Sequence, residues 1–431
     1  MENKLGNIFK GDKVIWMVFF FLCIISIVEV YSASSQLTYK GGSYLAPVIK
    51  HIGILVMGIF FMIITLNVGC RYFKIATPFL LIVSIATLLW VIIAGQSTNG
   101  AQRWISILGI QFQPSEIAKG TLVLATAQIL SAMQTPTGAD RNAFKYILIV
   151  SGIIIPLIMF ENLSTAVLLA GVIFFMMIIG RVPTQQLGKL MGIAVLGIVF
   201  IFAMVMIIGT DTGNVKKENN LTERTHEAKE DKGYKVFHRF DTWKSRIMKY
   251  ANNKDLRPED IDLDKDAQTA HANIAIASSN VVGKGPGNSV ERDFLSQAFS
   301  DFIYAIIIEE MGIIGAIIVA FLYIILLFRS GRIANRCENT FPAFLAMGLA
   351  LLLVTQALFN MCVAVGLAPV TGQPLPLVSK GGTSTVINCI YIGAILSISR
   401  SAKKKQIENE DLRTFDYRQH NCHNIIKLHK N

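Results

Sequence analysis

An aspartate stands at the point where a polar stretch of this chain becomes apolar. Residues 283–312, GKGPGNSVERDFLSQAFSDFIYAIIIEEMG, pass from a glycine-rich turn to Ser300 and Asp301. Residues 302–328 then form an apolar run that can cross a bilayer, with two adjacent glutamates as its only charges. Asp301 is therefore expected at the membrane–water boundary, where a carboxylate can reach both water and a lipid headgroup. The alternative is that Ser300 or Asp301 caps the helix that follows, which is a common role for both residue types.

A second group of candidate residues lies in and after the loop that follows the third apolar run. Arg103 and Trp104 combine a cation that can bind a phosphate with a ring that favours headgroup depth. Glu116 and Lys119 are three residues apart and share one face of the next helix, which Ser115 is expected to cap. Ionisable residues at the start of a membrane helix usually face protein or a wet cavity. A structural ion pair is the alternative, and the residues alone do not decide between the two interpretations.

The last outer loop, residues 366–384, is rich in proline and glycine although it lies within the apolar part of the chain. Non-helical backbone at membrane depth is tolerated only where it lines a cavity or is buried in protein. Lys380 precedes the amides of Gly381, Gly382 and Thr383, and this combination suits a phosphate oxygen.

Two further motifs carry little information by themselves. Residues 161–165 form a short outer turn with one acid, Glu161. The GKGPG turn at 283–287 has no preceding strand, so we interpret it as a plain turn rather than a dinucleotide-binding fingerprint. The short basic loops contain no nucleotide-binding loop, Ser-His-Asp order or zinc-protease motif, and their side of the membrane is expected to be non-catalytic.

The composition places these residues in a polytopic membrane protein. The chain has 431 residues, of which 52% are hydrophobic and 16% charged. We predict ten spans, at residues 14–32, 46–66, 75–94, 117–133, 146–160, 166–179, 187–208, 302–328, 341–365 and 385–398. The fifth, sixth and tenth are short, and the first is expected to be retained rather than cleaved as a signal peptide.

Lysine and arginine orient these spans. With both termini inside, the inner loops are basic, whereas the short outer loops hold mainly Lys40, Arg103 and Lys380. The net charge of +11 largely reflects this asymmetry and does not indicate nucleic-acid binding. We therefore predict an all-α fold with cytoplasmic N and C termini and one large extracytoplasmic loop, residues 210–300, between helices 7 and 8. The transmembrane domain is expected to cover residues 1–400, and residues 401–431 a cytoplasmic tail.

Taken in order, the motifs between residues 10 and 400 resemble the FtsW/RodA/SpoVE (SEDS) family, most closely its division branch, FtsW. The residues that carry the resemblance are Asn99-Gly100-Ala101 with Arg103-Trp104, Gln113-Pro114-Ser115-Glu116 with Lys119, the GKGPG turn, Ser300-Asp301-Phe302-Ile303 with Glu309-Glu310 and Gly312, Leu367 with Pro369-Val370-Thr371-Gly372, and Ser379 with Gly381-Gly382-Thr383-Ser384. The chain departs from the family pattern at Asn162, where an acid is usual, and at Lys380, where an aromatic residue often stands.

The resemblance implies a peptidoglycan glycosyltransferase that polymerises lipid II at the outer face of the cytoplasmic (inner) membrane, in septal wall synthesis. It implies a class B penicillin-binding protein and other divisome proteins as partners, and no nucleic acid. The substrate-binding residues that we expect are Arg103, Glu116, Lys119, Ser379, Lys380, Gly381, Gly382 and Ser384.

The chemistry of that reaction assigns a role to Asp301. Undecaprenyl pyrophosphate is a good leaving group, so the two-carboxylate arrangement of glycosidases is unnecessary. One base must take a proton from the acceptor hydroxyl, and cations must hold the pyrophosphate. Asp301, in register with the family's aspartate, is the expected catalytic base. No covalently bound cofactor or protein-held metal is expected, although a divalent cation, Mg or Mn, can assist.

Three alternatives remain open at this point. An elongation polymerase of the RodA type would use the same residues. A lipid II flippase would need a polar path to the inner face, whereas the marked residues cluster outside. A non-catalytic scaffold for a penicillin-binding protein would tolerate the loss of Asp301.

Overall fold

The computed structural model describes residues 10–33, 46–94, 96–98, 101–107, 110–208, 244, 248, 267–295 and 298–402. Most of the predicted 210–300 loop lies outside the described residues, as does the predicted tail from residue 403 onward. The predicted domain boundary at residue 400 therefore stays a prediction.

A long helix corresponds to each predicted span, which confirms the all-α polytopic fold. The helices are α2 (Lys13–Ala33), α4 (Ala46–Asn67), α5 (Cys70–Ala94), α6 (Pro114–Ala132), α7 (Arg141–Glu161), α8 (Leu163–Ile179), α9 (Thr184–Ile208), α12 (Ile303–Asn335), α13 (Thr340–Ala364) and an unlabelled C-terminal helix, Thr383–Ala402. Within the described part of the chain, 7 of them are long and apolar enough to cross a membrane by length and composition. The number of crossings, ten, stays a prediction.

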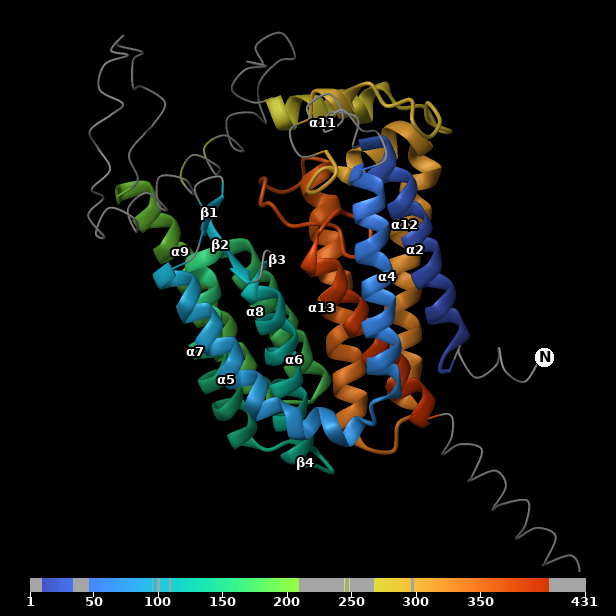
Figure 1. Ribbon diagram of the computed structural model, residues 1–431. Helices are drawn as coiled ribbons and strands as arrows, with labels where there is room; N and C mark the ends of the chain where they lie inside the picture. The colour runs from blue at the N-terminus through green and yellow to red at the C-terminus, as the bar shows by residue number, and fades with distance from the viewer. Residues whose placement is uncertain are drawn as a thin grey trace, which may run out of the picture.

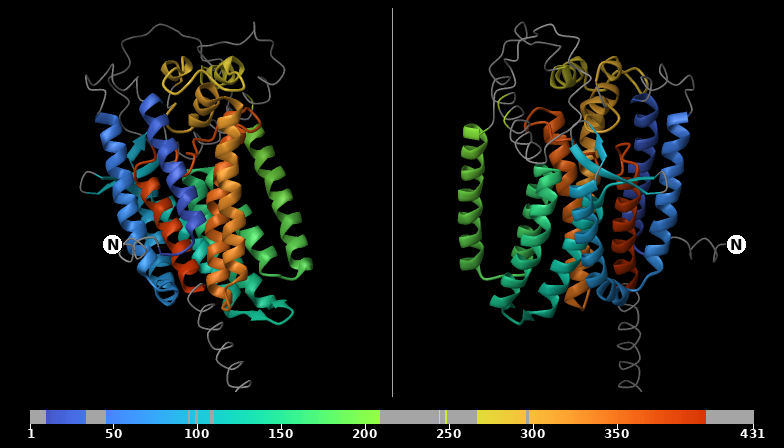
Figure 2. Two further views of the ribbon diagram at one scale, coloured as in Figure 1. Left: turned by 90° about the vertical axis from the view of Figure 1, so that its right-hand side faces the viewer. Right: turned by 60° about the vertical axis from the view of Figure 1, so that its left-hand side comes forward.

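The helices stand side by side in two groups (Figures 1 and 2). One group contains α5 to α9, and the other contains α2, α4, α12 and α13. Contacts between α6 and α13 join the two groups, and a continuous apolar core runs through both. The short helix α11 (Ala267–Ser278) packs against α12 and covers one end of the bundle.

Of the three spans predicted to be short, one is a short helix and two are longer helices than predicted. The sixth, α8, is indeed short, at 17 residues. The fifth and tenth were predicted too short, because α7 has 21 residues and the C-terminal helix has 20. Their ends are charged or polar, and such residues extend a helix beyond its apolar run without changing the hydropathy signal.

The structure adds small sheets that the apolar pattern does not predict. Strands β1 (Gln96–Thr98), β2 (Ala101–Ile107) and β3 (Ile110–Phe112) form an antiparallel sheet between α5 and α6. A second antiparallel pair, β4 (Gln134–Thr135) and β5 (Gly138–Ala139), joins α6 to α7 at the opposite end of the bundle. Four of these strands have two or three residues, below the length at which alternating hydrophobicity is detectable, and the seven residues of β2, AQRWISI, do not alternate strictly.

The starts of two helices differ from the sequence prediction. Ser115 does not cap α6: Gln113 occupies the N-cap position, and Pro114 stands in the first turn, where a missing N–H costs nothing. At α12 the N-cap residue is Phe302, so neither Ser300 nor Asp301 occupies it. The same helix is also interrupted at Gly312, whose φ of 68° and ψ of −171° are non-helical, and it continues to Asn335 rather than residue 328.

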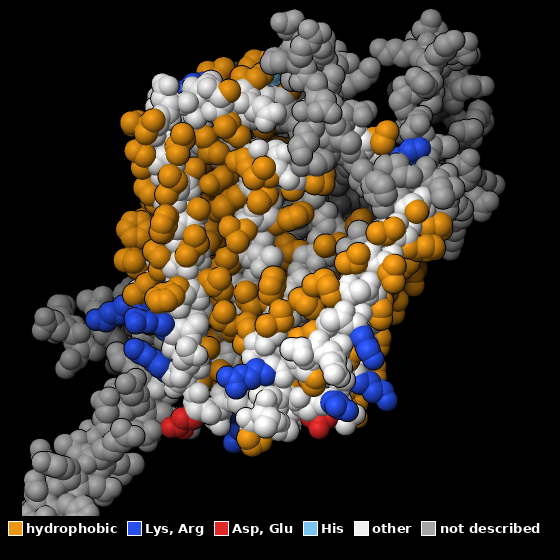
Figure 3. All heavy atoms as spheres, turned by 180° about the vertical axis from the view of Figure 1, so that it is seen from behind, with side chains coloured by type: hydrophobic (Ala, Val, Ile, Leu, Met, Phe, Trp, Pro, Cys, Tyr) orange, Lys and Arg blue, Asp and Glu red, His pale blue; other side chains and the backbone are white. Residues whose placement is uncertain are grey.

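The surface is apolar around the bundle and basic at one end. In Figure 3, apolar side chains cover most of the visible face, and lysine and arginine gather mainly at its lower end. Large apolar side chains such as Phe79 and Ile82, each 68% exposed, face outward as expected for contact with lipid. The protein is therefore a multi-pass membrane protein.

The basic end of the bundle is the end that we expect in the cytoplasm. Asn219→Cys in the long loop should therefore react with a membrane-impermeant thiol reagent added to whole cells. Labelling that occurs only after lysis would show that the long loop lies in the cytoplasm and the basic loops lie outside, which reverses the predicted orientation.

Candidate active site

The loop between α13 and the C-terminal helix is non-helical, and residues 371–379 of it are mostly buried in protein, which confirms that interpretation of its prolines and glycines. Its carbonyls lack the regular series of backbone N–H donors that a helix provides, and side chains from the surrounding helices donate to several of them. The donors and their acceptors are Asn360 Nδ2 to Gln373 O at 2.7 Å, Gln356 Nε2 to Pro374 O at 3.1 Å, Tyr323 OH to Pro376 O, and Ser26 Oγ to Val378 O at 2.7 Å. The donors come from α2, α12 and α13.

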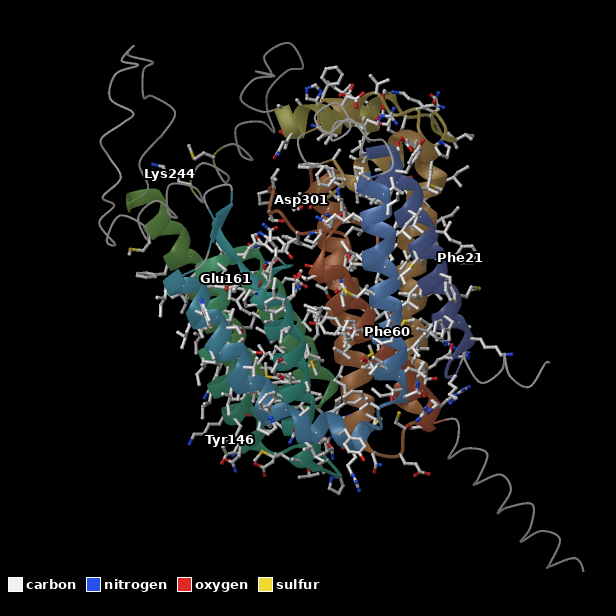
Figure 4. The ribbon with its side chains drawn as sticks, viewed as in Figure 1. Phe21, Phe60, Tyr146, Glu161, Lys244 and Asp301 are labelled. Carbon is white, nitrogen blue, oxygen red and sulfur yellow. The ribbon has the colours of Figure 1, made fainter. Side chains whose placement is uncertain are left out.

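This loop holds the segment that contains Asp301. The Ser379 hydroxyl donates to the Ser300 carbonyl at 2.6 Å, and the Lys380 amide donates to the Phe299 carbonyl at 3.0 Å. The Asn360 amide group donates its second hydrogen to the Asp301 carbonyl at 2.8 Å. Asp301 itself is half-buried, and the Ser300 hydroxyl donates to its Oδ1 at 3.0 Å. Its backbone is therefore fixed from two sides, whereas its carboxylate lies at the end of the bundle remote from the basic loops (Figure 4).

Glu116 and Lys119 form a buried ion pair beneath the same loop. Lys119 Nζ lies 2.8 Å from Glu116 Oε1 and 2.8 Å from Gln356 Oε1, and both charged side chains are almost fully buried. Gln356 then reaches the Pro374 carbonyl. The geometry therefore supports the structural interpretation of the pair, and a direct substrate contact by either residue stays a prediction.

Lys380 is the candidate cation whose surroundings are partly open. Its ammonium lies 4.9 Å from the centre of the Phe299 ring, a cation–π geometry. Burial lowers the pKa of Lys380 from its ordinary value of 10.5, and the positive charge of Lys50 lowers it further. Gly381 and Gly382 follow directly and precede a helix that begins at Thr383. Their amides therefore lie at a helix N-terminus, where unbonded N–H groups favour an anion.

Of the remaining predicted residues, Ser384 lies at the end of this loop and Arg103 on a strand next to one that contacts it. Thr383 Oγ1 donates to the Gln111 carbonyl at 3.3 Å, which brings β3 against the start of the C-terminal helix. Arg103 lies on β2, the strand next to β3, but its side chain is outside the described residues. Ser384 is buried, and its amide donates to the Gly381 carbonyl.

The turn between α7 and α8, for which the sequence pattern was only a weak signal, contacts the buried loop. Glu161 is 1% exposed and Thr165 is buried. Gln373 Nε2 donates to Thr165 Oγ1 at 2.5 Å, so the turn contacts the buried loop directly. Asn162, which replaces the acid usual in the family, caps α8 by accepting from the Ser164 amide at 3.1 Å. Figure 4 shows Glu161 toward the same end of the helices as Asp301, and Tyr146 near the opposite end.

The glycine turn has a structural role, as its sequence suggested. It wraps around the kink in α12, where Gly287 N donates to Glu310 Oε2 at 2.9 Å and Lys284 Nζ lies 2.6 Å from Glu309 Oε1. A Cβ atom on Gly283 would approach the Glu310 carbonyl oxygen to 2.3 Å, so only glycine fits there. The two glutamates inside the predicted span are therefore paired with the turn rather than exposed to lipid.

Sequence reasoning missed the two amide side chains that organise the site. Gln356 and Asn360 are four residues apart and lie on one face of α13, inside an otherwise apolar run. Polar residues within a membrane helix usually face the protein interior, and that rule would have identified them. Among the described residues, no group of three or more His, Cys, Asp and Glu lies close enough to hold a metal ion.

The chain matches known proteins over most of its length. The chain matches the family model FTSW_RODA_SPOVE, described as "Cell cycle protein", over residues 12–242 and 238–404. It is 28% identical over 408 residues to the probable peptidoglycan glycosyltransferase FtsW of Geobacter metallireducens, covering 93% of this chain and 97% of that protein. It is also 28% identical over 394 residues to the peptidoglycan glycosyltransferase MrdB of Escherichia coli, covering 91% of this chain and 94% of that protein.

Two solved structures share the fold. The rod shape determining protein RodA of Thermus thermophilus superposes with a TM-score of 0.60 at 20% identity, covering 91% of this chain and 97% of that chain. A chain from a structure described as a peptidoglycan synthase complex, in which polymerization and crosslinking are coordinated, gives a TM-score of 0.67 at 21% identity, covering 91% of this chain and 98% of that chain.

Proposed function

Because the chain belongs to the FtsW/RodA/SpoVE family, we propose that it is a peptidoglycan glycosyltransferase that polymerises lipid II into glycan strands at the outer face of the cytoplasmic membrane. The observation that carries this proposal is the position of Asp301. Its backbone is held by Asn360, and that of the preceding Ser300 by Ser379, at the end of the bundle opposite the basic loops. A fixed carboxylate at that level meets the headgroup of a lipid-linked sugar.

The reaction needs little more than a base and a site for pyrophosphate. Asp301 takes the proton from the acceptor sugar hydroxyl as that oxygen forms a bond to the anomeric carbon of the donor. The bond from that carbon to the pyrophosphate oxygen breaks, and undecaprenyl pyrophosphate leaves as an anion without needing an acid. Attack from the face opposite an α-linked leaving group gives a β linkage.

The pyrophosphate site that we propose consists of Lys380 and the amides of Gly381 and Gly382, with Arg103 on the neighbouring strand. Lys119 contributes indirectly, because its ammonium already bonds to Glu116 and Gln356. Because Glu116 compensates the positive charge of Lys119, a divalent cation, Mg or Mn, would supply the positive charge that the pyrophosphate needs. The pyrophosphate itself provides oxygen ligands for such a cation.

The lowered pKa of Lys380 predicts how activity depends on pH. The charged ammonium is the form that binds pyrophosphate, and a lowered pKa means that it loses its proton at a lower pH than an ordinary lysine does. Polymerisation should therefore decline on the alkaline side before ordinary lysines titrate. Lys380→Arg keeps its charge to higher pH, so the alkaline decline should move upward. If the wild type and Lys380→Arg lose polymerisation activity at the same alkaline pH, deprotonation of Lys380 does not cause the decline.

We propose a class B penicillin-binding protein and other divisome proteins as partners, and septal synthesis as the setting. The relation to a structure described as coordinating polymerization and crosslinking supports a partner that crosslinks. Relatives named FtsW and MrdB are both 28% identical, so identity alone does not favour division over elongation. Recruitment of a fluorescent fusion to the division site, rather than to the side wall, would support the septal role.

Incubation of the purified protein with lipid II tests the proposed function. A polymerase produces glycan strands, whereas a flippase moves lipid II between leaflets of a vesicle without joining sugars. The buried loop and Asp301 cluster at one end of the helices, which favours polymerisation.

A further inference from the structure

A buried hydrogen-bonded relay reaches the active-site loop from the helices on its far side. The hydroxyl of Ser26, on α2, donates to the Val378 carbonyl at 2.7 Å. The same oxygen lies 2.8 Å from Nε2 of His51, on α4. Both side chains are 0% exposed, so neither exchanges its partner for water. Ser26 therefore caps a carbonyl of this loop and is itself held by a titratable side chain, as Gln356 is held by Lys119.

The number of hydrogens on each group determines which residue donates in the Ser26–His51 hydrogen bond. A serine hydroxyl has one hydrogen, and here it goes to the Val378 carbonyl. The Ser26–His51 bond therefore needs a hydrogen on His51 Nε2, which donates to Ser26 Oγ. Nδ1 of His51 is buried and has no hydrogen-bond partner among the described residues. The imidazole thus acts as an N–H donor that fixes the serine rotamer.

The relay ends at a backbone position that is under strain. Leu377, just before Val378, has a φ of 66°, a left-handed conformation that a side chain of its kind rarely adopts. Such a conformation persists only where its surroundings determine it from several sides. Tyr323 bonds to the Pro376 carbonyl before Leu377, and Ser26 bonds to the Val378 carbonyl after it. The strained residue is therefore clamped on both sides.

The two residues that follow Val378 bond to the segment that contains Asp301, residues 299–301. Ser379 bonds to the Ser300 carbonyl, and the Lys380 amide bonds to the Phe299 carbonyl. A shift of Val378 moves both contacts, and with them the carboxylate of Asp301 and the ammonium of Lys380. A chain of bonds thus runs from His51 through Ser26 and the loop to Asp301.

We propose that His51 and Ser26 are positioning residues for glycosyl transfer, which set the register of the 378–380 segment against residues 299–301. The expected change in kcat rests on the proposed function. The expected change in the contact between residues 378–380 and residues 299–301 can be measured without it. Removing either hydrogen bond lets the strained turn relax and leaves lipid II contacts elsewhere intact.

Kinetics of the full-length protein with its partner test the first consequence. Ser26→Ala and His51→Leu should each lower kcat about 10-fold or more, because misplacement of reacting groups by ~1 Å costs up to ~100-fold. The KM for lipid II should change much less than kcat. His51→Gln keeps an N–H donor and should recover most of the lost kcat. A matched control is Ser397→Ala, since Ser397 is equally buried and donates to the Val68 carbonyl at the other end of the bundle.

Two kinetic outcomes would overturn the proposal. One is a kcat for Ser26→Ala equal to that of Ser397→Ala. The other is a kcat for His51→Gln as low as that of His51→Leu, since a donor would then be irrelevant.

Disulfide formation tests the register without relying on catalysis. Phe299→Cys together with Lys380→Cys places two thiols on backbone segments joined by a 3.0 Å hydrogen bond, so mild oxidation should crosslink them. Adding Ser26→Ala or His51→Leu should slow this crosslinking, and adding Ser397→Ala should not. Equal crosslinking rates in all backgrounds would overturn the positioning role. If the wild type makes no polymer yet crosslinking slows as expected, the proposed function fails, but the placement of residues 378–380 against residues 299–301 by Ser26 and His51 is confirmed.

Discussion

Asp301→Asn should reduce polymerisation of lipid II by about 100-fold or more, as expected when a general base is lost. Asparagine has nearly the same size and can accept the bond from Ser300, but its amide does not take up a proton at neutral pH. The backbone bond from Asn360 uses the Asp301 carbonyl and is unaffected by the change. Membrane abundance and binding to the partner should therefore stay normal.

Asp293→Asn is the matched control for that measurement. Asp293 is a partly exposed aspartate in the loop before α12, on a short 3₁₀ turn, Glu291–Asp293. The substitution is chemically identical but lies outside the segment that the buried loop holds, so activity should remain near that of the wild type. If Asp301→Asn also polymerises at the wild-type rate, Asp301 is not the base, and a capping or scaffold role becomes the better explanation.

Lys119→Ala should destabilise the protein severely. Glu116 would be left buried without its cation, and breaking a buried ion pair in this way typically costs about 3–5 kcal/mol. Gln356 would also lose its partner, which loosens its hold on the Pro374 carbonyl. Unfolding of the purified protein in detergent, followed by tryptophan fluorescence, measures the loss in the free energy of unfolding.

A neutral double substitution separates structure from substrate binding at this pair. Glu116→Gln with Lys119→Met removes both charges and keeps similar volumes, so most of the stability should return. Return of activity with stability would confirm the structural role of the ion pair. A stable double variant that no longer uses lipid II would instead show that the Lys119 charge acts on the substrate.

The sequence predicted the parts of this fold that depend on local patterns. Apolar runs identified the long helices of the described residues, and proline and glycine within residues 366–384 identified a buried non-helical loop. The change from polar to apolar residues at Asp301 placed it at an end of the bundle. The apolar runs and the change at Asp301 reflect the solvent preference of neighbouring residues, and the proline and glycine signal reflects their local backbone conformations.

The sequence did not predict the contacts that assemble the site. Ser26 and Val378 are 352 positions apart, and Gln373 and Thr165 are 208 positions apart. Nothing in an apolar run indicates which backbone carbonyl a single serine or amide will meet, because that depends on how distant helices pack. The kink at Gly312 was likewise missed, because nothing near it in the sequence indicates that Val281 and Gly283 pack directly against it.

Synthesis of glycan strands by the purified protein together with a class B penicillin-binding protein tests most directly whether Asp301 acts as the base of a lipid II polymerase. The transpeptidase of the partner should be blocked with a β-lactam, so that uncrosslinked polymer can be resolved on a gel. We expect β-linked strands from lipid II, reduced about 100-fold or more when this chain carries Asp301→Asn. A complex that is stable and binds lipid II but makes no strands, or makes them equally well with Asp301→Asn, would contradict this expectation.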